Sequence, residues 1–242
     1  MNKVVGPEKS NGLEIFAGFR QLNGTIRLEM DVSNVSSPSD ISGLAIQLNK
    51  NAFGLSPASQ QIVFNPPISS GSSGKNVVEL VVTPNMLAPQ QPGQPASPQV
   101  QVAIKNMATG SVFYFAVNFN LEALFSSDGT MERSAFIESW KSIDDRNELY
   151  GTVSDLPPSS VDIDQVQQKF KANNVFFIAR RPVPNAEGQE VVYFSMRTLT
   201  NMEFLAELTF KQGVTACKVC VKTESAAYGP LAKQALEYLL RS

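Results

Sequence analysis

The chain has 242 residues, of which 43% are hydrophobic and 17% are charged, and its formal net charge is -2. These values are typical of a folded protein and argue against both intrinsic disorder and a general nucleic-acid binder. The sequence contains no histidine, which excludes Ser-His-Asp and Cys-His catalysis and any histidine-ligated zinc or haem.

Composition divides the chain near Phe125. Residues 1–125 contain 10 of the 15 prolines and 14 charged side chains, whereas residues 126–242 contain 28 charged side chains. The intervening run SSDGT, at 126–130, has the composition of a turn. We therefore expect two subdomains, 1–125 and 126–242.

The first subdomain is predicted to consist of strands. Apolar and polar residues alternate over 13–19 and 26–32, and shorter strand-like runs follow at 44–48, 62–64, 77–82, 100–104 and 112–119. Alternation of this kind, interrupted by turn clusters, predicts a β-sandwich. The segments 71–74 (GSSG) and 89–98, which is rich in Gln and Pro, are predicted loops.

The second subdomain mixes helical and strand periods. A helix is predicted over 131–143, with Phe136, Trp140 and Ile143 on one face. A strand over 148–156 precedes a second helix, which a capping box of Ser159 and Asp162 opens and which ends at 173–174. Four strands, at 175–181, 191–198, 203–210 and 216–222, and a last helix from Pro230 complete an antiparallel sheet with helices packed on it.

Strand alternation also predicts which side chains share a sheet face. The apolar set of strand 191–198 should face the helices, which leaves Tyr193 on the other face beside Leu205 and Glu207. An aromatic pair of Trp140 and Tyr193 among charged residues has the composition of a peptide-binding hot spot. The alternative from the sequence is that Trp140 belongs to the core.

The sequence offers little for catalysis or metal binding. Cys217 and Cys220 form a C-x-x-C, but the surrounding ACKVCVK predicts a strand, in which residues three apart point to opposite faces. No dinucleotide-binding glycine motif, P-loop or nucleophile elbow occurs. We therefore assign no catalytic residue, metal site or cofactor, and an enzyme that uses carboxylates alone is the weakest hypothesis.

Neither a membrane span nor a signal peptide is predicted. The longest apolar run, 112–117, is far shorter than the ~20 residues that span a bilayer, and the first ten residues lack the apolar core of a signal peptide. We expect a soluble, cytosolic protein.

Longer segments resemble the C-terminal appendage, or ear, of a beta-adaptin, a large subunit of the clathrin adaptor complexes. In chain order they are GLEIFAGF, QLNKNAFGL, VQVAIKN with VFYF, DGTMERSAFIESWKSI with NELY, NNVFFIARR, GQEVVYFSM and FLAEL. The resemblance implies an α+β fold of two subdomains, an immunoglobulin-like β-sandwich followed by an α/β platform with a five-stranded antiparallel sheet flanked by helices. It also implies a non-enzymatic appendage that recruits accessory or cargo-adaptor proteins and clathrin to coated vesicles, in endocytosis or in trans-Golgi transport.

Two peptide-binding sites are implied by the resemblance. On the platform, a short amphipathic helix of the ligand would lie beside Trp140 and Tyr193, and a ligand Arg would meet Glu148 or Glu207. The charged residues around this pair would be Lys141, Arg133, Glu148, Arg181 and Glu207, with Arg180 as the alternative to Arg181. On the sandwich, Tyr114 would be the centre of a second site for acidic, Phe-containing peptides, with charge from Lys50 and Lys105. The sequence departs from the family pattern at 181–186 and at 203–204.

The resemblance implies partners as well. They are accessory proteins with short Phe-containing helical or acidic motifs, the clathrin heavy chain, and other adaptor subunits through the trunk of the larger subunit. Nucleic acid is not expected, and membrane contact would be indirect, through the adaptor complex on coated pits, coated vesicles and trans-Golgi membranes. The alternative is a generic two-domain cytosolic interaction module that binds through the face or edge of the sandwich.

Overall fold

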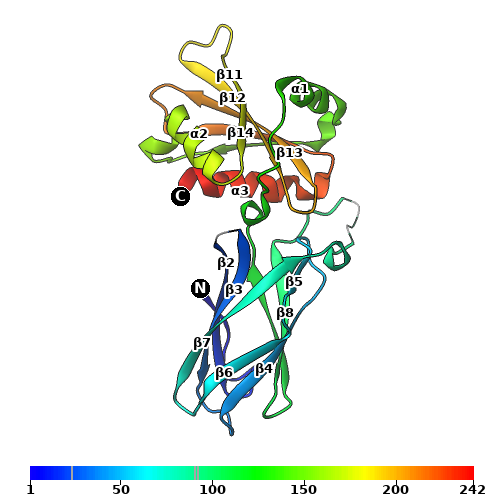
Figure 1. The fold of residues 1–242 in the computed structure, drawn as a ribbon. Coiled ribbons are helices and arrows are strands. Elements are labelled where there is room, and N and C mark those ends of the chain that lie inside the picture. The colour runs from blue at the N-terminus through cyan, green and yellow to red at the C-terminus, as the bar shows by residue number, and fades with distance from the viewer. Residues whose placement is uncertain (23, 90, 92) are drawn as a thin grey trace. The chain divides into compact units, whose positions relative to one another are not determined.

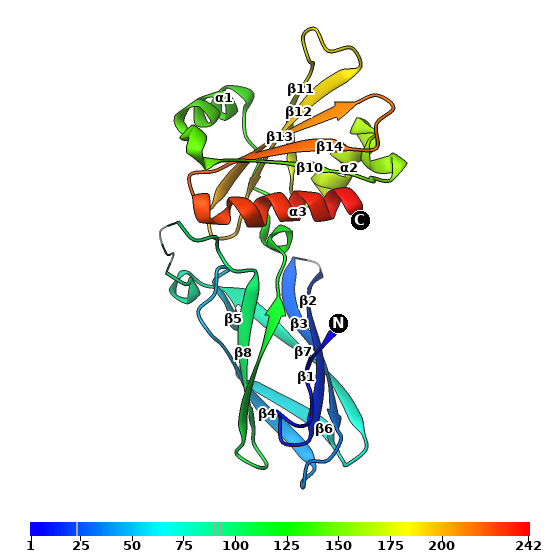
Figure 2. The same cartoon turned by 180° about the vertical axis from the view of Figure 1, so that it is seen from behind.

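The computed structural model describes residues 1–22, 24–89, 91 and 93–242. It divides into two compact units, Met1–Pro89 with Ser97–Phe119, and Gln90–Ala96 with Asn120–Ser242. We call the first unit the sandwich and the second the platform (Figures 1 and 2). Positions 90 and 92 of the predicted loop 89–98 lie outside the described residues.

Two antiparallel sheets make up the sandwich, with strand orders β1-β2-β3-β7-β5 and β6-β4-β8-β9. The strands of the first sheet are β1 (Asn2–Val5), β2 (Leu13–Leu22), β3 (Thr25–Asn34), β5 (Leu55–Pro57) and β7 (Ser73–Val82). Those of the second are β4 (Ile41–Leu48), β6 (Gln61–Ile68), β8 (Gln99–Asn106) and β9 (Val112–Asn118).

Alternating side chains build the core of the sandwich. In β3, Ile26, Leu28, Met30 and Val32 are buried, while the residues between them are more exposed. The same period operates in β8 and β9, so each sheet turns one apolar face inward. The predicted β-sandwich is therefore confirmed.

The strands predicted from the sequence differ from the observed strands of the sandwich in two respects. The short strands β1 and β5 were not predicted, because runs of four and three residues are too brief to show alternation. Part of the predicted loop 71–74 belongs to β7, since Ser73 and Gly74 pair with β3. A Cβ at Gly74 would lie 2.9 Å from the Ile68 side chain, so the glycine permits a close approach here.

The platform contains one five-stranded antiparallel sheet with the order β10-β14-β13-β12-β11. Its strands are β10 (Glu148–Val153), β11 (Phe176–Pro182), β12 (Gln189–Arg197), β13 (Glu203–Lys211) and β14 (Cys217–Lys222). Its helices are α1 (Arg133–Ser142), α2 (Ile163–Ala172) and α3 (Gly229–Arg241). Short 3₁₀ turns occur at Pro84–Met86, Leu121–Leu124, Asp145–Asn147, Pro158–Ser160 and Ala226–Tyr228. The α+β fold of two subdomains is confirmed.

Helices cover both faces of the platform sheet. On one face, Phe170 of α2 lies 4.9 Å from Phe194 of β12, ring centroid to centroid, and α3 runs along β14 and β10 (Figure 2). On the opposite face, Phe136 of α1 packs against Leu205 and Tyr193. We call these the α2 face and the α1 face.

The start of α2 corrects the predicted capping box. Ser159 lies in a 3₁₀ turn, and Asp162 is the N-cap, with its carboxylate accepting from the backbone N–H groups of Asp164 and Gln165. The Gln165 side chain donates back to the same carboxylate at 3.1 Å. The cap is therefore Asp162 alone and not a capping box that begins at Ser159, because the Asp162 carboxylate accepts from the free N–H groups of the first turn while its own backbone N–H donates to Pro158.

Cys217 and Cys220 occupy β14 as predicted, and both are buried free thiols. Burial raises the pKa of each thiol to about 12, so neither is a reactive thiolate at neutral pH.

Among the described residues, no helix combines the length and the apolar character that a bilayer crossing requires.

Candidate peptide-binding site

The α1 face of the platform sheet carries a continuous row of side chains across all five strands. Register pairs Tyr150 with Cys220, Cys220 with Glu207, Glu207 with Tyr193, and Tyr193 with Ala179. The predicted neighbours Tyr193 and Glu207 are therefore directly opposite each other on β12 and β13. Antiparallel pairing makes such partners contact neighbours.

Three aromatic rings meet where α1 crosses this row. Phe136 stacks on Trp140 with ring centroids 5.5 Å apart and meets Tyr193 edge-on at 5.6 Å. Trp140 and Tyr193 form a second edge contact at 6.3 Å. Phe136 is buried with Leu205, whereas Trp140 and Tyr193 are only partly buried. The cluster is thus anchored in the core and presents two rings to solvent.

The exposed sides of Trp140 and Tyr193 line a groove of about 380 Å³. Its lining residues are Arg133, Phe136, Ile137, Trp140, Lys141, Ile178, Ala179, Arg180, Arg181, Tyr193 and Glu207. Six of the seven platform residues predicted from the sequence are in this set, and Glu148 is the exception. A larger cavity of about 1040 Å³ lies on the α2 face, but Phe210 is the aromatic side chain in its lining, and that ring is buried.

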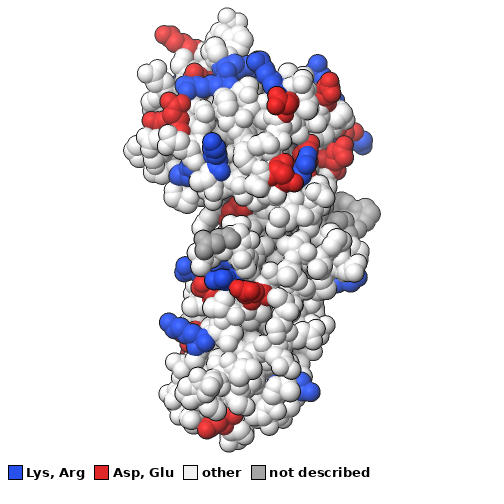
Figure 3. Space-filling model, viewed as in Figure 1, with Lys and Arg blue, Asp and Glu red and all other residues white. Residues whose placement is uncertain are grey.

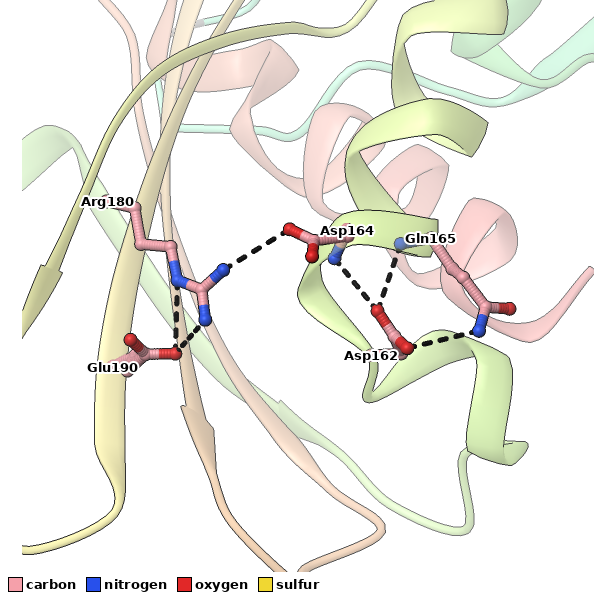
Figure 4. A network of polar contacts seen from close by, with 5 residues as sticks. All are labelled: Asp162, Asp164, Gln165, Arg180 and Glu190. Atoms are coloured by element: carbon pink, nitrogen blue, oxygen red, sulfur yellow. Dashed lines mark hydrogen bonds and ion pairs between the residues drawn. The ribbon is translucent and has the colours of Figure 1, made fainter.

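The structure separates the two arginines that the sequence left as alternatives. A register shift in β11 between Phe177 and Ala179 turns Arg181 toward the α1 face, where its guanidinium donates two hydrogen bonds, at 2.6 and 3.0 Å, to the Tyr193 hydroxyl. Arg180 points to the α2 face and is held by Glu190 and by Asp164, the latter at 3.3 Å (Figure 4). Arg181 is therefore the arginine beside the aromatic pair.

Charge around the groove is mostly positive. Arg133, Lys141, Arg180 and Arg181 line it together with one carboxylate, Glu207, and basic side chains gather over β11 and beside α1 (Figure 3). Burial raises the pKa of Tyr193, and the charge of Glu207 adds to this rise while Arg181 opposes it. The hydroxyl is therefore protonated at neutral pH, so it accepts from Arg181 and keeps a proton to donate.

Glu148 occupies a different position from the one that the sequence suggests. Its carboxylate lies 3.6 Å from the Lys222 ammonium and accepts a hydrogen bond from the Tyr150 hydroxyl. Lys222 also donates to Asp145 at 2.9 Å and lies 5.6 Å from the centroid of the Trp140 ring. Burial by itself would lower the pKa of Lys222, but its hydrogen bond to Asp145 and the charges of Glu148 and Asp145 raise it above its usual value.

Sequence reasoning did not single out Lys222, nor the apolar walls Ile137 and Ile178. Strand alternation could have identified Lys222. This residue lies two positions beyond Cys220 and thus shares the α1 face with Glu207, and its register partners are Glu148 and Leu205. Ile178 has no comparable signal, because the register shift in β11 determines which way it points.

The sandwich presents Tyr114 on an open sheet surface. Its side chain is 66% exposed on the outer face of β9, next to exposed Val112, while Phe113 and Phe115 are buried. Register pairs Tyr114 with Ala103 and Val112 with Lys105, so Lys105 lies diagonally across from Tyr114 on the same face. Lys50 follows the end of β4 and is exposed.

Comparison with known proteins agrees with this architecture. Residues 126–240 match the model of the family described as the beta2-adaptin appendage, C-terminal sub-domain. The chain is 31% identical over 227 residues to an AP-1 complex subunit beta of Dictyostelium discoideum, covering 93% of this chain. It is 30% identical to the AP-1 complex subunit beta-1 of Mus musculus over 234 residues and to that of Homo sapiens over 237, each covering 97% of this chain.

A β-sandwich followed by an α/β platform defines the architectural class, and these matches define the family. The chain belongs to the beta-adaptin appendage family. It spans 23% of the length of each of these relatives.

Proposed function

We propose that this chain acts as the non-enzymatic appendage of a clathrin adaptor beta subunit. In this function it recruits accessory and cargo-adaptor proteins, and clathrin, to coats on pits, vesicles or trans-Golgi membranes. It works in the cytoplasm and reaches membranes through the remainder of the adaptor. The relatives are named as subunits of the AP-1 complex, and a corresponding assembly for this chain is part of the proposal.

One observation carries the proposal at the residue level. Trp140 and Tyr193 offer two partly buried rings at a groove whose rim is positive, with one carboxylate, Glu207. Aromatic anchors surrounded by polar groups are typical of interface hot spots. An amphipathic helix with Phe or Leu anchors fits such a groove, with its acidic residues toward Arg133, Lys141 and Arg181 and a cationic residue at Glu207 or Glu148.

Each contact of this kind is expected to be weak. A short peptide must order into a helix when it binds, which costs several kcal/mol and places single sites near micromolar affinity. Several appendages on one coat then raise the overall affinity on the order of 100-fold or more through effective concentration. Recruitment can therefore be strong on a coat and reversible in solution.

The test is calorimetric titration with an acidic peptide of the pattern Phe-x-x-Phe-x-x-x-Arg. We expect saturable micromolar binding, which Trp140→Ala and Tyr193→Ala each weaken by about 30-fold or more, the loss of a hot-spot ring of about 2 kcal/mol. Tyr114→Ala is the matched control, because it removes an exposed aromatic residue from the sandwich. Unchanged affinity in Trp140→Ala would refute the platform groove as the site.

The sandwich surface is a second candidate site. Tyr114 is highly exposed beside Val112, with Lys105 diagonally across, and exposed aromatic and aliphatic side chains on an open sheet face suit an extended, Phe-containing acidic peptide. If Tyr114→Ala, and not Trp140→Ala, abolishes binding of the probe, the generic module that binds through the sandwich is the better description.

A further inference from the structure

Lys222 is an unusual residue to find against the Trp140 ring. Its side chain is 2% exposed, although it carries a charge at neutral pH. It is the last residue of β14 on the α1 face, in register with Leu205 on one side and Glu148 on the other. A buried ammonium is costly in free energy unless neighbouring groups compensate its charge, so we consider each group around this lysine.

Three groups surround the Lys222 ammonium. Asp145 Oδ1 lies 2.9 Å away, Glu148 Oε1 lies 3.6 Å away, and the centroid of the Trp140 ring lies 5.6 Å away. The last distance is that of a cation–π contact, which is strongest when the cation is desolvated. Together with Phe136 and Tyr193, the lysine is a third neighbour that fixes the orientation of the indole.

The same lysine accounts for the position of Glu148. The Glu148 side chain is 15% exposed; one of its carboxylate oxygens forms the ion pair with the Lys222 ammonium, and the other accepts a hydrogen bond from the Tyr150 hydroxyl. A ligand guanidinium would have to displace an internal cation to reach it. Glu207 lines the groove directly and is in register with Tyr193.

We propose that Lys222 is a positioning residue of the groove. It orients the Trp140 ring and forms an ion pair with Glu148, so that the cationic residue of a bound peptide is recognised by Glu207. The inference rests on the proposed function of the groove and assigns its specificity: one ligand cation at the Glu207 side, and ligand anions toward Arg133, Lys141 and Arg181.

The first test compares two isosteric substitutions, Glu207→Gln and Glu148→Gln, by calorimetry with the Phe-x-x-Phe-x-x-x-Arg peptide and its Arg→Gln variant. Glu207→Gln should weaken binding about tenfold or more and should make the two peptides bind equally, since a charge-assisted hydrogen bond is lost. Glu148→Gln should change affinity by less than about threefold and preserve the preference for the Arg peptide. The reverse assignment would overturn the inference.

The second test addresses the orientation of Trp140, the one tryptophan of the chain. Lys222→Met removes the cation from the indole and should shift the tryptophan emission of the free protein and weaken peptide binding about tenfold. Lys222→Arg should restore both, because it returns a cation to the same place. Lys218→Met, an exposed lysine of the same strand and face, is the matched control and should change neither.

The outcomes distinguish the role of Lys222 from the role of the groove as the peptide site. Loss of binding in Trp140→Ala with no change in emission or affinity for Lys222→Met would refute the role of Lys222 and leave the groove intact. Unchanged binding in Trp140→Ala would refute the groove itself. If Lys222→Met fails to fold, the Glu207→Gln and Glu148→Gln pair decides the inference alone.

Discussion

The platform groove and the Tyr114 surface present aromatic side chains in opposite ways. In the platform, the partly buried ring of Trp140 stacks on Phe136, which is itself part of the buried cluster with Leu205. In the sandwich, Tyr114 projects from the outer face of β9, and the buried Phe113 and Phe115 lie on the inner face. Contact surface and core are continuous in the platform and separate in the sandwich.

This difference determines how a substitution in each surface affects the fold. We expect a substitution in the cluster of Phe136, Trp140 and Tyr193 to alter both folding and the proposed recognition, because the same rings would serve both. A sheet instead sends alternate residues to opposite faces, so the outer face of the sandwich can change its ligand contacts without repacking the core. Preorganised rings bind with less loss of freedom than mobile ones, so we expect the packing of Trp140 and Tyr193 on the core to add to the affinity of the proposed peptide site.

Truncation of Phe136 is the strongest way to test this coupling. Phe136→Ala should lower the free energy of unfolding by about 3–5 kcal/mol, as expected for a buried aromatic ring, and should also weaken peptide binding at the groove in the protein that remains folded. Thermal unfolding and calorimetry measure the two effects. Phe113→Ala, which is equally buried in the sandwich, should cost similar stability and leave groove binding unchanged. Equal loss of groove binding in both variants would contradict the coupling.

Alkaline pH should affect the platform selectively, because both cysteines lie there. Burial raises the pKa of Cys217 to about 12, whereas an unfolded thiol titrates near 8.5. The unfolded state therefore loses its proton first, and the stability present below about pH 8.5 declines as the pH rises toward the folded pKa.

For Cys217 this amounts to about 2 kcal/mol by about pH 10. Denaturant unfolding followed by Trp140 fluorescence reports on the platform, and Cys217→Ala should flatten the pH dependence by that amount. An identical alkaline slope in Cys217→Ala would show that other groups are responsible.

Truncation of Tyr114 should have the smallest effect on stability. Tyr114→Ala removes a side chain that is 66% exposed, so the free energy of unfolding should change by no more than about 0.5 kcal/mol. Val112→Ala, on the same face, is the control. Binding of acidic, Phe-containing peptides to the sandwich should fall in Tyr114→Ala while groove binding persists. A large loss of stability would mean that the outer face contributes to packing after all.

Much of the fold could be predicted because it follows from local periodicity. The alternation in β3 and β9 predicted the correct strands, and the helical spacing of Phe136 and Trp140 predicted α1; Ile143, just after the helix, packs in the same cluster. Register followed as well, since Tyr193 and Glu207 are paired as expected. The short strands β1 and β5 depend on their partners rather than on their own pattern, so the sequence carried no signal for them.

The site could be predicted less completely, for a physical reason. Lys222 and Glu148 meet through strand register, 74 positions apart in the numbering, and only the fold reveals that the lysine is buried. The choice between Arg180 and Arg181 depended on a register shift that local sequence does not encode. Which peptides bind, and whether the Tyr114 surface is used, remain predictions.

The neighbouring arginines Arg180 and Arg181 hold the edge strand β11 by contacts on opposite faces of the sheet. Arg180 ties it to β12 and to the first turn of α2 through Glu190 and Asp164, and Arg181 ties it to Tyr193 at the groove. Deletion of one residue in β11 before this pair would put Pro182 in the register position of Arg181, and an insertion there would put Ala179 in the register position of Arg180. The deletion would remove the partner of Tyr193 and the insertion would remove the contacts to Glu190 and Asp164, so chain length in this segment should tolerate less variation than residue identity.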